Sequence, residues 1–134
     1  MPSNLKISFL FVFLLGSQID SFAQMNPKYV AEVGAVRNSR ITRGQFLAQL
    51  GVSGQRRITQ HHWEPIIIDS FTLIVIRDTV VLVQYKNHGD FFEANLRKAM
   101  TALKTNDLVL IFNIYGRDVG DKLVQPPPLQ YEIE

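Results

Sequence analysis

The sequence IIIDSFTLIVIRDTVVLVQY, residues 66–85, decides the fold of this chain. It is dense in β-branched and aromatic residues, which favour strands, and only Arg77-Asp78-Thr79 interrupts it, where a hairpin turn would fall. The stretch therefore predicts two adjacent antiparallel strands. In the first, strict alternation puts Ile66, Ile68 and Ile74 on one face and Phe71 and Val75 on the other. A strand that is apolar on both faces lies in the centre of a sandwich or under a helix.

Shorter runs of strand composition lie on both sides of this hairpin. They are residues 29–33, which Gly34 stops, and residues 107–115, 122–124 and 129–133. The last run alternates cleanly after three prolines, so we expect it to have one wet face. About six strands with hairpin links predict an α+β, mainly β domain, an antiparallel sandwich with two packed helices.

The first predicted helix follows Thr42. Thr42 and Gln45 have the spacing of a capping box, in which each side chain bonds an amide of the first turn. Phe46 and Leu50 then share one face, and Gly51 is suited to the left-handed position after the helix. Two turns are unstable alone, so we expect Phe46 and Leu50 to dock on the rest of the domain.

The second predicted helix spans about 14 residues after Asp90. Asp90 and Glu93 repeat the capping-box spacing. One face is apolar, and its members are Phe92, Leu96, Ala99, Met100 and Leu103. The polar face has both acidic and basic residues, whereas helices that bind membrane surfaces concentrate basic ones. We therefore expect the helix to pack on the sheet and not to anchor the chain in a membrane.

The first 23 residues have the pattern of a signal peptide. An apolar run over 7–15 follows Lys6, and Ser21-Phe22-Ala23 presents small residues where signal peptidase cleaves. We predict cleavage between Ala23 and Gln24, leaving residues 24–134 as a single domain. The alternative is an uncleaved anchor, but Gln18 and Asp20 end the run before the roughly 20 residues that a bilayer requires. The expected location is the periplasm or the cell exterior.

Composition excludes several classes of site. The chain has 134 residues and no cysteine, which rules out disulfides, thiolate metal sites and thiol nucleophiles. Its 14 basic and 12 acidic residues give a formal net charge of +2. That charge is small for a protein that binds the phosphate backbone, so we expect no nucleic-acid partner.

Catalytic and metal-binding patterns are weak. On an extended chain His62 and Glu64 share a face and His61 lies on the other, so the run supplies at most two ligands per face where a metal needs three. No serine has the context of a nucleophile elbow and no glycine loop matches a phosphate cradle. Asp69 lies within an apolar run, where burial would raise its pKa, unless it faces solvent or pairs with an arginine. We expect a protein that is not an enzyme and has no cofactor.

One cluster has the composition of a binding surface. It consists of Arg56, Arg57, His61, His62 and Trp63. Tryptophan and arginine are enriched among residues that dominate protein interfaces. The alternative is a solvated loop with one core tryptophan. The sequence leaves open whether the domain is a monomer or a homodimer.

The order of several motifs resembles a known family. Ala31-x-Val33-Gly34, then Phe46-Leu47-Ala48-Gln49-Leu50-Gly51-Val52, then Ile66-x-Ile68-x-Ser70-Phe71-x-Leu73 are similar to the carboxyl-terminal domain of GldM and PorM proteins. The late helix, the strand from Leu108, the glycine turn and the final strand follow in that order. The resemblance extends over nearly all of residues 24–134.

The resemblance implies an immunoglobulin-like fold and a role without catalysis. GldM-type proteins are inner-membrane subunits of the gliding and type IX secretion machinery, and their terminal domain is thought to meet ring-forming partners beneath the outer membrane. We expect the chain to depart from them in two ways. It should lack their transmembrane helix and preceding periplasmic domains, and Arg37-Asn38-Ser39-Arg40 stands where the family is usually richer in glycine. The expected partners are envelope or secretion-machinery proteins. A small exported ligand-binding protein is the alternative.

Overall fold

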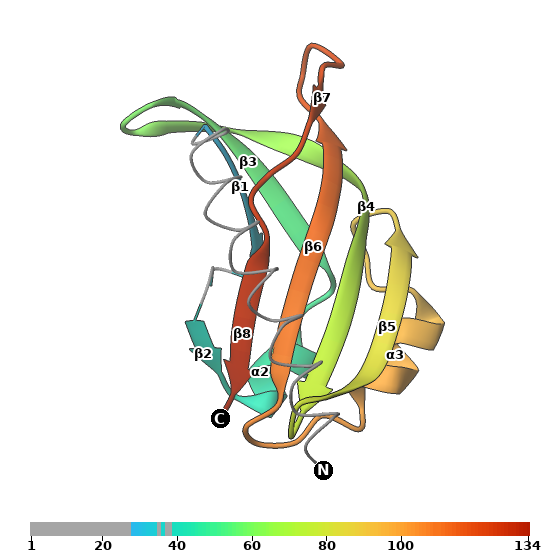
Figure 1. Cartoon of the computed structure of the whole chain (residues 1–134). Helices are drawn as coiled ribbons and strands as arrows, with labels where there is room; N and C mark the ends of the chain where they lie inside the picture. Colours follow the sequence, from blue (N-terminus) through green and yellow to red (C-terminus); the bar gives the residue numbers. More distant parts are fainter. Residues whose placement is uncertain (1–27, 35, 37–38) are drawn as a thin grey trace.

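The computed structural model describes residues 28–34, 36 and 39–134, and the chain there is mainly β with two short helices (Figure 1). The strands are β1 (Tyr29–Val33), β2 (Ser39–Ile41), β3 (Val52–Thr59), β4 (His62–Arg77), β5 (Val80–His88), β6 (Leu108–Arg117), β7 (Leu123–Val124) and β8 (Leu129–Ile133). The helices are α2 (Arg43–Leu47) and α3 (Ala94–Met100). The predicted signal peptide lies outside the described residues.

All eight of these strands belong to one curled sheet. Its order is β1-β3-β4-β6-β8-β2, with β5 paired to β4 and β7 paired to β6. All pairs are antiparallel except β2 and β8, which run parallel. The prediction of a mainly β chain with two helices is confirmed, but the expectation of a wholly antiparallel sheet is wrong at this pair. The long chain between β2 and β8 allows a parallel pair, which a hairpin connection does not.

The predicted hairpin forms β4 and β5. Its turn is Asp78-Thr79, and both residues have positive φ, 49° and 67°. Two such residues make the turn whose twist matches the flanking strands. β4 is the centre of the fold, because it pairs with β3 near its start and with both β5 and β6 along its second half.

Strict alternation along β4 does not hold. Irregularities in the pairing with β6 lie on both sides of Ser70. They shift the facing of the strand, so Ile68 and Phe71 point into the same core, although alternation assigns them to opposite faces. Beyond the shift, Phe71, Leu73 and Val75 face the main core, whereas Ile74 and Ile76 join Leu110 in a second cluster. Both faces of the second half are therefore apolar and buried, as the sequence predicts.

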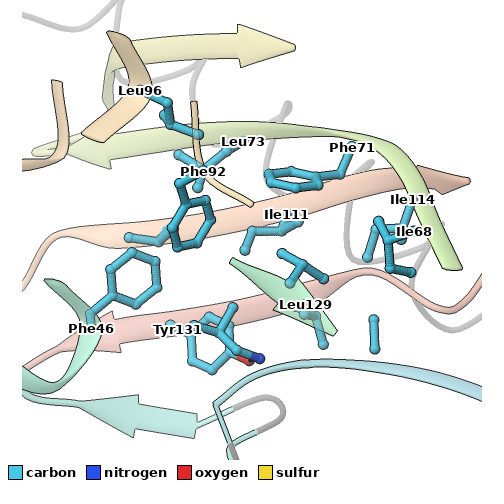
Figure 2. Packing of buried hydrophobic residues seen from close by; sticks show 14 of the residues in the cluster. Phe46, Ile68, Phe71, Leu73, Phe92, Leu96, Ile111, Ile114, Leu129 and Tyr131 are labelled. Carbon is cyan, nitrogen blue, oxygen red and sulfur yellow. Dashed lines mark hydrogen bonds between the residues drawn. The ribbon is translucent and has the colours of Figure 1, made fainter. Parts of the chain in front are cut away.

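The main core lies inside the curl of the sheet (Figure 2). Phe46 from α2 lies 6.1 Å from Phe92 and 5.9 Å from Tyr131, measured between ring centroids. Phe71 meets Phe92 edge to face at 5.9 Å. Side chains from distant parts of the sequence thus meet in one aromatic cluster that joins both helical regions to the sheet.

Helix α2 confirms its capping box and corrects its extent. The Thr42 hydroxyl accepts from the Gln45 N–H, and the Gln45 side chain accepts from the Thr42 N–H. Phe46 is fully buried, as predicted, but Leu50 is 63% exposed because the helix ends at Leu47, before Leu50 can share its face. Gly51 is not a left-handed cap, since it forms a bridge with Phe91.

Helix α3 is half the predicted length. It begins after Glu93 and has no side-chain cap, because the Glu93 carboxylate accepts instead from the Tyr85 hydroxyl and the His88 N–H. The predicted capping box at Asp90 is therefore wrong. The predicted apolar face is correct at its buried members Phe92, Leu96, Met100 and Leu103. None of the helices in the described part of the chain is long and apolar enough to span a membrane.

The sequence did not predict two strands, β2 and β3. β2 has only three residues, and β3 reads VSGQRRIT, without an apolar alternation. The final strand was predicted correctly, and its pattern of buried and exposed residues alternates over Leu129–Ile133. β6 extends two residues beyond its predicted end, through Gly116 and Arg117.

Candidate interaction site

The five residues of the predicted binding surface lie on one projecting hairpin. Arg56 and Arg57 belong to the end of β3, His61 to the turn, and His62 and Trp63 to the start of β4. In Figure 1 this hairpin extends away from the rest of the sheet at the upper left. We call residues 55–65 the β3–β4 tip. The sequence placed these residues in a loop or at a strand edge, and strand pairing is what brings the two halves of the cluster together.

Cross-strand pairing joins Arg57 to Trp63. The two residues are direct partners in the β3–β4 register, and the Arg57 guanidinium carbon lies 6.0 Å from the Trp63 ring centroid. This is the range of a cation–π contact, which contributes about 0.5–1 kcal/mol at an exposed site. Arg57 is exposed and Trp63 is half-buried. The contact therefore presents an aromatic and a cationic group together on the surface.

The histidines lie at the far end of the tip. His61 and His62 are both exposed, and His62 Nε2 lies 3.9 Å from Glu64 Oε1. His62 and Glu64 therefore share a face, as alternation predicts. No group of three histidine, cysteine, aspartate or glutamate residues that could hold a metal ion occurs among residues 28–34, 36 and 39–134.

Arg56 connects the tip to the loop between β6 and β7. Its Nη1 lies 4.0 Å from Asp118 Oδ2, and the Tyr29 hydroxyl donates to the same oxygen at 3.4 Å. Arg56 and Tyr29 are direct neighbours in the pairing of β1 with β3. The Asp118 carboxylate is buried, and this ion pair links the base of the tip to the β6–β7 loop.

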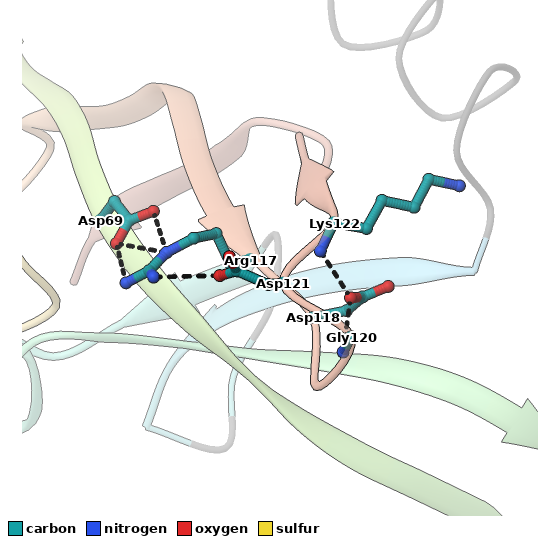
Figure 3. A network of polar contacts seen from close by, with 6 residues as sticks. All are labelled: Asp69, Arg117, Asp118, Gly120, Asp121 and Lys122. Atoms are coloured by element: carbon teal, nitrogen blue, oxygen red, sulfur yellow. Dashed lines mark hydrogen bonds and ion pairs between the residues drawn. The ribbon is translucent and has the colours of Figure 1, made fainter.

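The β6–β7 loop is itself built around Asp118 (Figure 3). Asp118 Oδ1 accepts from the N–H groups of Gly120 and Lys122, both at 2.9 Å. The Lys122 N–H contributes most to holding the pKa of Asp118 below its usual range, and the Gly120 N–H and the charge of Arg56 act in the same direction. Asp118 is therefore an ionised structural centre of the loop.

A second ion pair, between Arg117 of β6 and Asp69 of β4, lies next to the β6–β7 loop (Figure 3). The Arg117 guanidinium binds both carboxylate oxygens of Asp69, with Nε 3.0 Å from Oδ2 and Nη2 3.1 Å from Oδ1. Its Nη1 also donates to Asp121 at 3.1 Å. Of the alternatives for Asp69, pairing with an arginine is the one that the structure has.

A half-open groove of about 410 Å³ lies beside the base of the tip. Its lining comprises Tyr29, Tyr115, Gly116, Lys122, Leu123, Val124 and Gln125. Tyr115 and Leu123 are strongly exposed there, so the groove has an apolar rim. Lys122 is its one charged lining residue among those described. Such a lining suits a partly apolar side chain or small molecule better than a charged metabolite.

Asp118, Arg117 and Tyr29 were missed as members of this site. The signal for Asp118 was present in Asp118-Val119-Gly120, because aspartate two residues before glycine is typical of a turn in which the carboxylate bonds the following amides. No local signal connects Asp118 to Arg56, which lies 62 positions earlier, because only the pairing of β1 with β3 brings Tyr29 and Arg56 to the loop.

Comparison with known proteins adds no assignment. No family model matches the chain, and no curated protein matches it significantly. The resemblance to the GldM and PorM domain therefore stays a prediction.

Proposed function

We propose that the chain is a non-catalytic, exported interaction module that binds envelope or secretion-machinery proteins, as the resemblance to the terminal domain of GldM-type subunits implies. The observation that supports this proposal is the β3–β4 tip, where Arg57 and Trp63 are paired outside the core. Tryptophan and arginine are the residue types that most often dominate binding energy in interfaces. The tip thus has the composition of a binding element on a projecting support.

The strands and loop that hold the β3–β4 tip in place favour this function. Binding costs less when the contact residues are already held in place. The tip is the β3–β4 hairpin, and β1 pairs with its base at Gln55 and Arg56. Arg56 Nη1 also lies 4.0 Å from Asp118 Oδ2, and the β6–β7 loop amides hold that carboxylate. The Arg117–Asp69 pair joins β6 to β4 immediately beyond it. We therefore expect the tip to meet a partner with little rearrangement.

The proposal includes the finer fold assignment. We infer that the curled sheet is a variant of the immunoglobulin-like sandwich. In support, residues of β1 and β3 share the main core with residues of β6 and β8, so two parts of the sheet face each other across one interior. The variant differs from a sandwich of two separate sheets because β4 continues from one part into the other.

Export is part of the same proposal. We propose that residues 1–23 are removed and that residues 24–134 act in the periplasm or outside the cell. The intact mass of the exported protein tests this directly. We expect the mass of residues 24–134, and a mass that corresponds to the chain from Met1 contradicts cleavage.

Site-specific crosslinking tests the interaction. We would place a photo-crosslinking residue at Gln60, which is exposed in the turn of the tip, and irradiate cells that make the type IX secretion machinery. The expected products are adducts with ring-forming envelope proteins, and Trp63→Ala should reduce their yield several-fold. Phe91→Ala is the matched control, because Phe91 is also an aromatic residue and is 63% exposed away from the tip. Equal loss in both variants, or no adduct at all, contradicts the proposal.

The groove supports the alternative, a small ligand-binding protein. Its volume lies within the range of small-molecule sites, and Tyr29 and Tyr115 line it. Mass spectrometry of the purified protein under native conditions would reveal a bound molecule. A stoichiometric ligand that Tyr115→Ala releases, together with no crosslinks from the tip, would favour this function.

A further inference from the structure

The two faces of the sheet at the β3–β4 tip carry different side chains. Residues that are direct partners in neighbouring strands lie on the same face, and successive residues of a strand alternate between faces. Ala31, Gly54 and Ile66 are partners across β1, β3 and β4, and all three are buried, so they define the core face. The residues that alternate with them lie on the opposite face, which we call the outer face.

On the core face of the tip, the arginine has carboxylates near it. Arg56 lies opposite Glu64 in the β3–β4 register, and its Nη1 lies 4.0 Å from Asp118 Oδ2. His62 Nε2 lies 3.9 Å from Glu64 Oε1 on the same face. The positive charge of Arg56 is therefore balanced within the chain.

The outer face of the tip has cations without carboxylates. Arg57 lies opposite Trp63, and its N–H donates to the Lys28 carbonyl oxygen at 2.7 Å, which places Lys28 in the same row. Lys28 and Arg57 are exposed, and neither forms an ion pair with a described carboxylate. The first carboxylate of β1 on this face is Glu32, four residues from Lys28 and about 13 Å along the strand. Two adjacent positive charges are thus left for a partner to neutralise.

Apolar side chains lie beside these two cations. Pro65 follows Trp63 on the outer face of β4, and Ile67 follows Pro65. Pro65 is exposed, and Ile67 is 58% exposed. Val30 lies in the row of Pro65, because Gln55 is the β3 partner of both. We call this set the outer strip, and its members are Lys28, Val30, Arg57, Trp63, Pro65 and Ile67.

The charge of the outer strip identifies the kind of occupant. Interfaces pair positive surfaces with negative ones, so two unbalanced cations favour an acidic partner. A second copy bound through the same strip would bring four cations together, which opposes such a dimer. Membrane surfaces with acidic lipids are recognised by clusters of about four to eight basic residues, and the strip has two. An acidic protein segment is therefore the favoured occupant, and the apolar members of the strip require apolar residues beside its carboxylates.

We propose that the outer strip binds an acidic segment of an envelope protein. Carboxylates of that segment contact Lys28 and Arg57, and neighbouring apolar side chains lie on Trp63, Pro65 and Ile67. This inference rests on the proposed function, because it names the chemistry of the partner that the interaction module binds. It also assigns the contact to one face of the tip, since the charges of the core face are balanced within the chain.

Charge reversal on the outer strip tests the proposal. We would introduce Lys28→Glu and Arg57→Glu into the chain that carries the photo-crosslinking residue at Gln60. Each variant should lower the yield of adducts several-fold, and the double variant should lower it about tenfold or more, because like charges then oppose each other across the interface. The matched control is Lys86→Glu, which makes the same change at an exposed lysine of β5 outside the strip and should keep the yield.

The outcomes separate this proposal from the proposed function. If adducts form and Lys28→Glu gives the same yield as Lys86→Glu, the acidic partner is wrong while the interaction module stands. If the unchanged chain gives no adducts, both are wrong. Circular dichroism and thermal melting show whether each variant is folded. Lys28→Glu decides the test if Arg57→Glu is unfolded, because Lys28 is exposed and its side chain has no ion pair with a described residue to lose.

The chemistry of the partner can also be read directly. With the photo-crosslinking residue at Pro65, mass spectrometry of the adduct should identify a partner segment that has aspartate or glutamate beside apolar residues. A segment without acidic residues overturns the proposal. Flotation of the purified protein with vesicles of phosphatidylethanolamine and phosphatidylglycerol tests a membrane as the occupant. We expect no binding, and binding that Lys28→Glu abolishes would assign the strip to a membrane and overturn the proposal.

Discussion

The two ends of β4 have opposite environments although they belong to one strand. Residues 70–76 lie between β5 and β6 and include core residues, whereas residues 62–65 pair with β3 in the projecting tip. The first region is apolar on both faces, and the second has an exposed histidine, His62, and a half-buried tryptophan, Trp63. The difference teaches that one end of a strand can stabilise the fold while the other end remains exposed for contact with a partner.

The core end should respond most strongly to truncation. Phe71 is 1% exposed and meets Phe92 edge to face, so Phe71→Ala leaves a cavity in the aromatic cluster. We expect the free energy of unfolding to fall by about 3–5 kcal/mol. Urea unfolding measures this. Phe91→Ala, at an exposed position, should change it by less than about 0.5 kcal/mol. If the two variants are equally stable, the division between core and surface is wrong.

Tyr131 tests a polar contact inside the same core. Its buried hydroxyl accepts from the Val33 N–H at 3.0 Å and donates to the Val36 carbonyl oxygen. Tyr131→Phe removes both bonds, but the Val33 N–H still donates to the Val36 carbonyl oxygen at 3.2 Å. The loss should therefore be about 0.5–1.5 kcal/mol, the net contribution of an ordinary hydrogen bond. The control is Tyr115→Phe, because the Tyr115 side chain is exposed and its loss of a hydroxyl should change stability little.

The same tyrosine predicts a response to alkaline pH. Burial raises the pKa of Tyr131 to about 12, from an ordinary value of 10.0. The folded state therefore favours the neutral phenol, and this contribution to stability is complete below pH 10 and is lost as pH rises to about 12. Tyr85, whose pKa its bond to Glu93 raises, contributes with the same sign. Tyr131→Phe should reduce the fall in stability over this range but not abolish it.

The same contrast explains what the sequence could predict. β-Branched density located most of β4, β5 and their turn. In β4 the apolar signal is continuous because the second half of the strand is buried on both faces, whereas β5 has the same composition although residues 80–82 are exposed. This density could not locate β3, since a strand that pairs at a solvated tip needs no apolar alternation. The alternation that located β4 also assigned Ile68 and Phe71 to different faces, and the bulges at Ser70 have no signature strong enough to prevent that error.

The site divides in the same way. Composition picked out Arg56, Arg57, His61, His62 and Trp63 because they are close in sequence. Asp118 completes the base of the tip through contacts with distant residues. It lies 62 positions after Arg56 and 89 positions after Tyr29. Local patterns contain no record of such contacts. The pairing of β1 with β3 creates them only after the sheet has formed.

The tip should show the smallest effect on stability. Trp63→Ala removes the contact with Arg57, which contributes about 0.5–1 kcal/mol, and opens no cavity between β5 and β6. We therefore expect a loss of about 1 kcal/mol or less in urea unfolding, against several for Phe71→Ala. Arg57→Ala removes the same contact from its other side, so its loss should be similar and the double variant should cost less than the sum of the two.

A larger loss at Trp63 would change the meaning of the comparison. If Trp63→Ala costs as much as Phe71→Ala, the tryptophan stabilises the fold and the tip is an extension of the core. If the loss is small while crosslinking from Gln60 falls several-fold, the residue acts at the surface. The two measurements together separate these cases, because a general loss of folding lowers stability and crosslinking alike, whereas a contact residue lowers crosslinking alone.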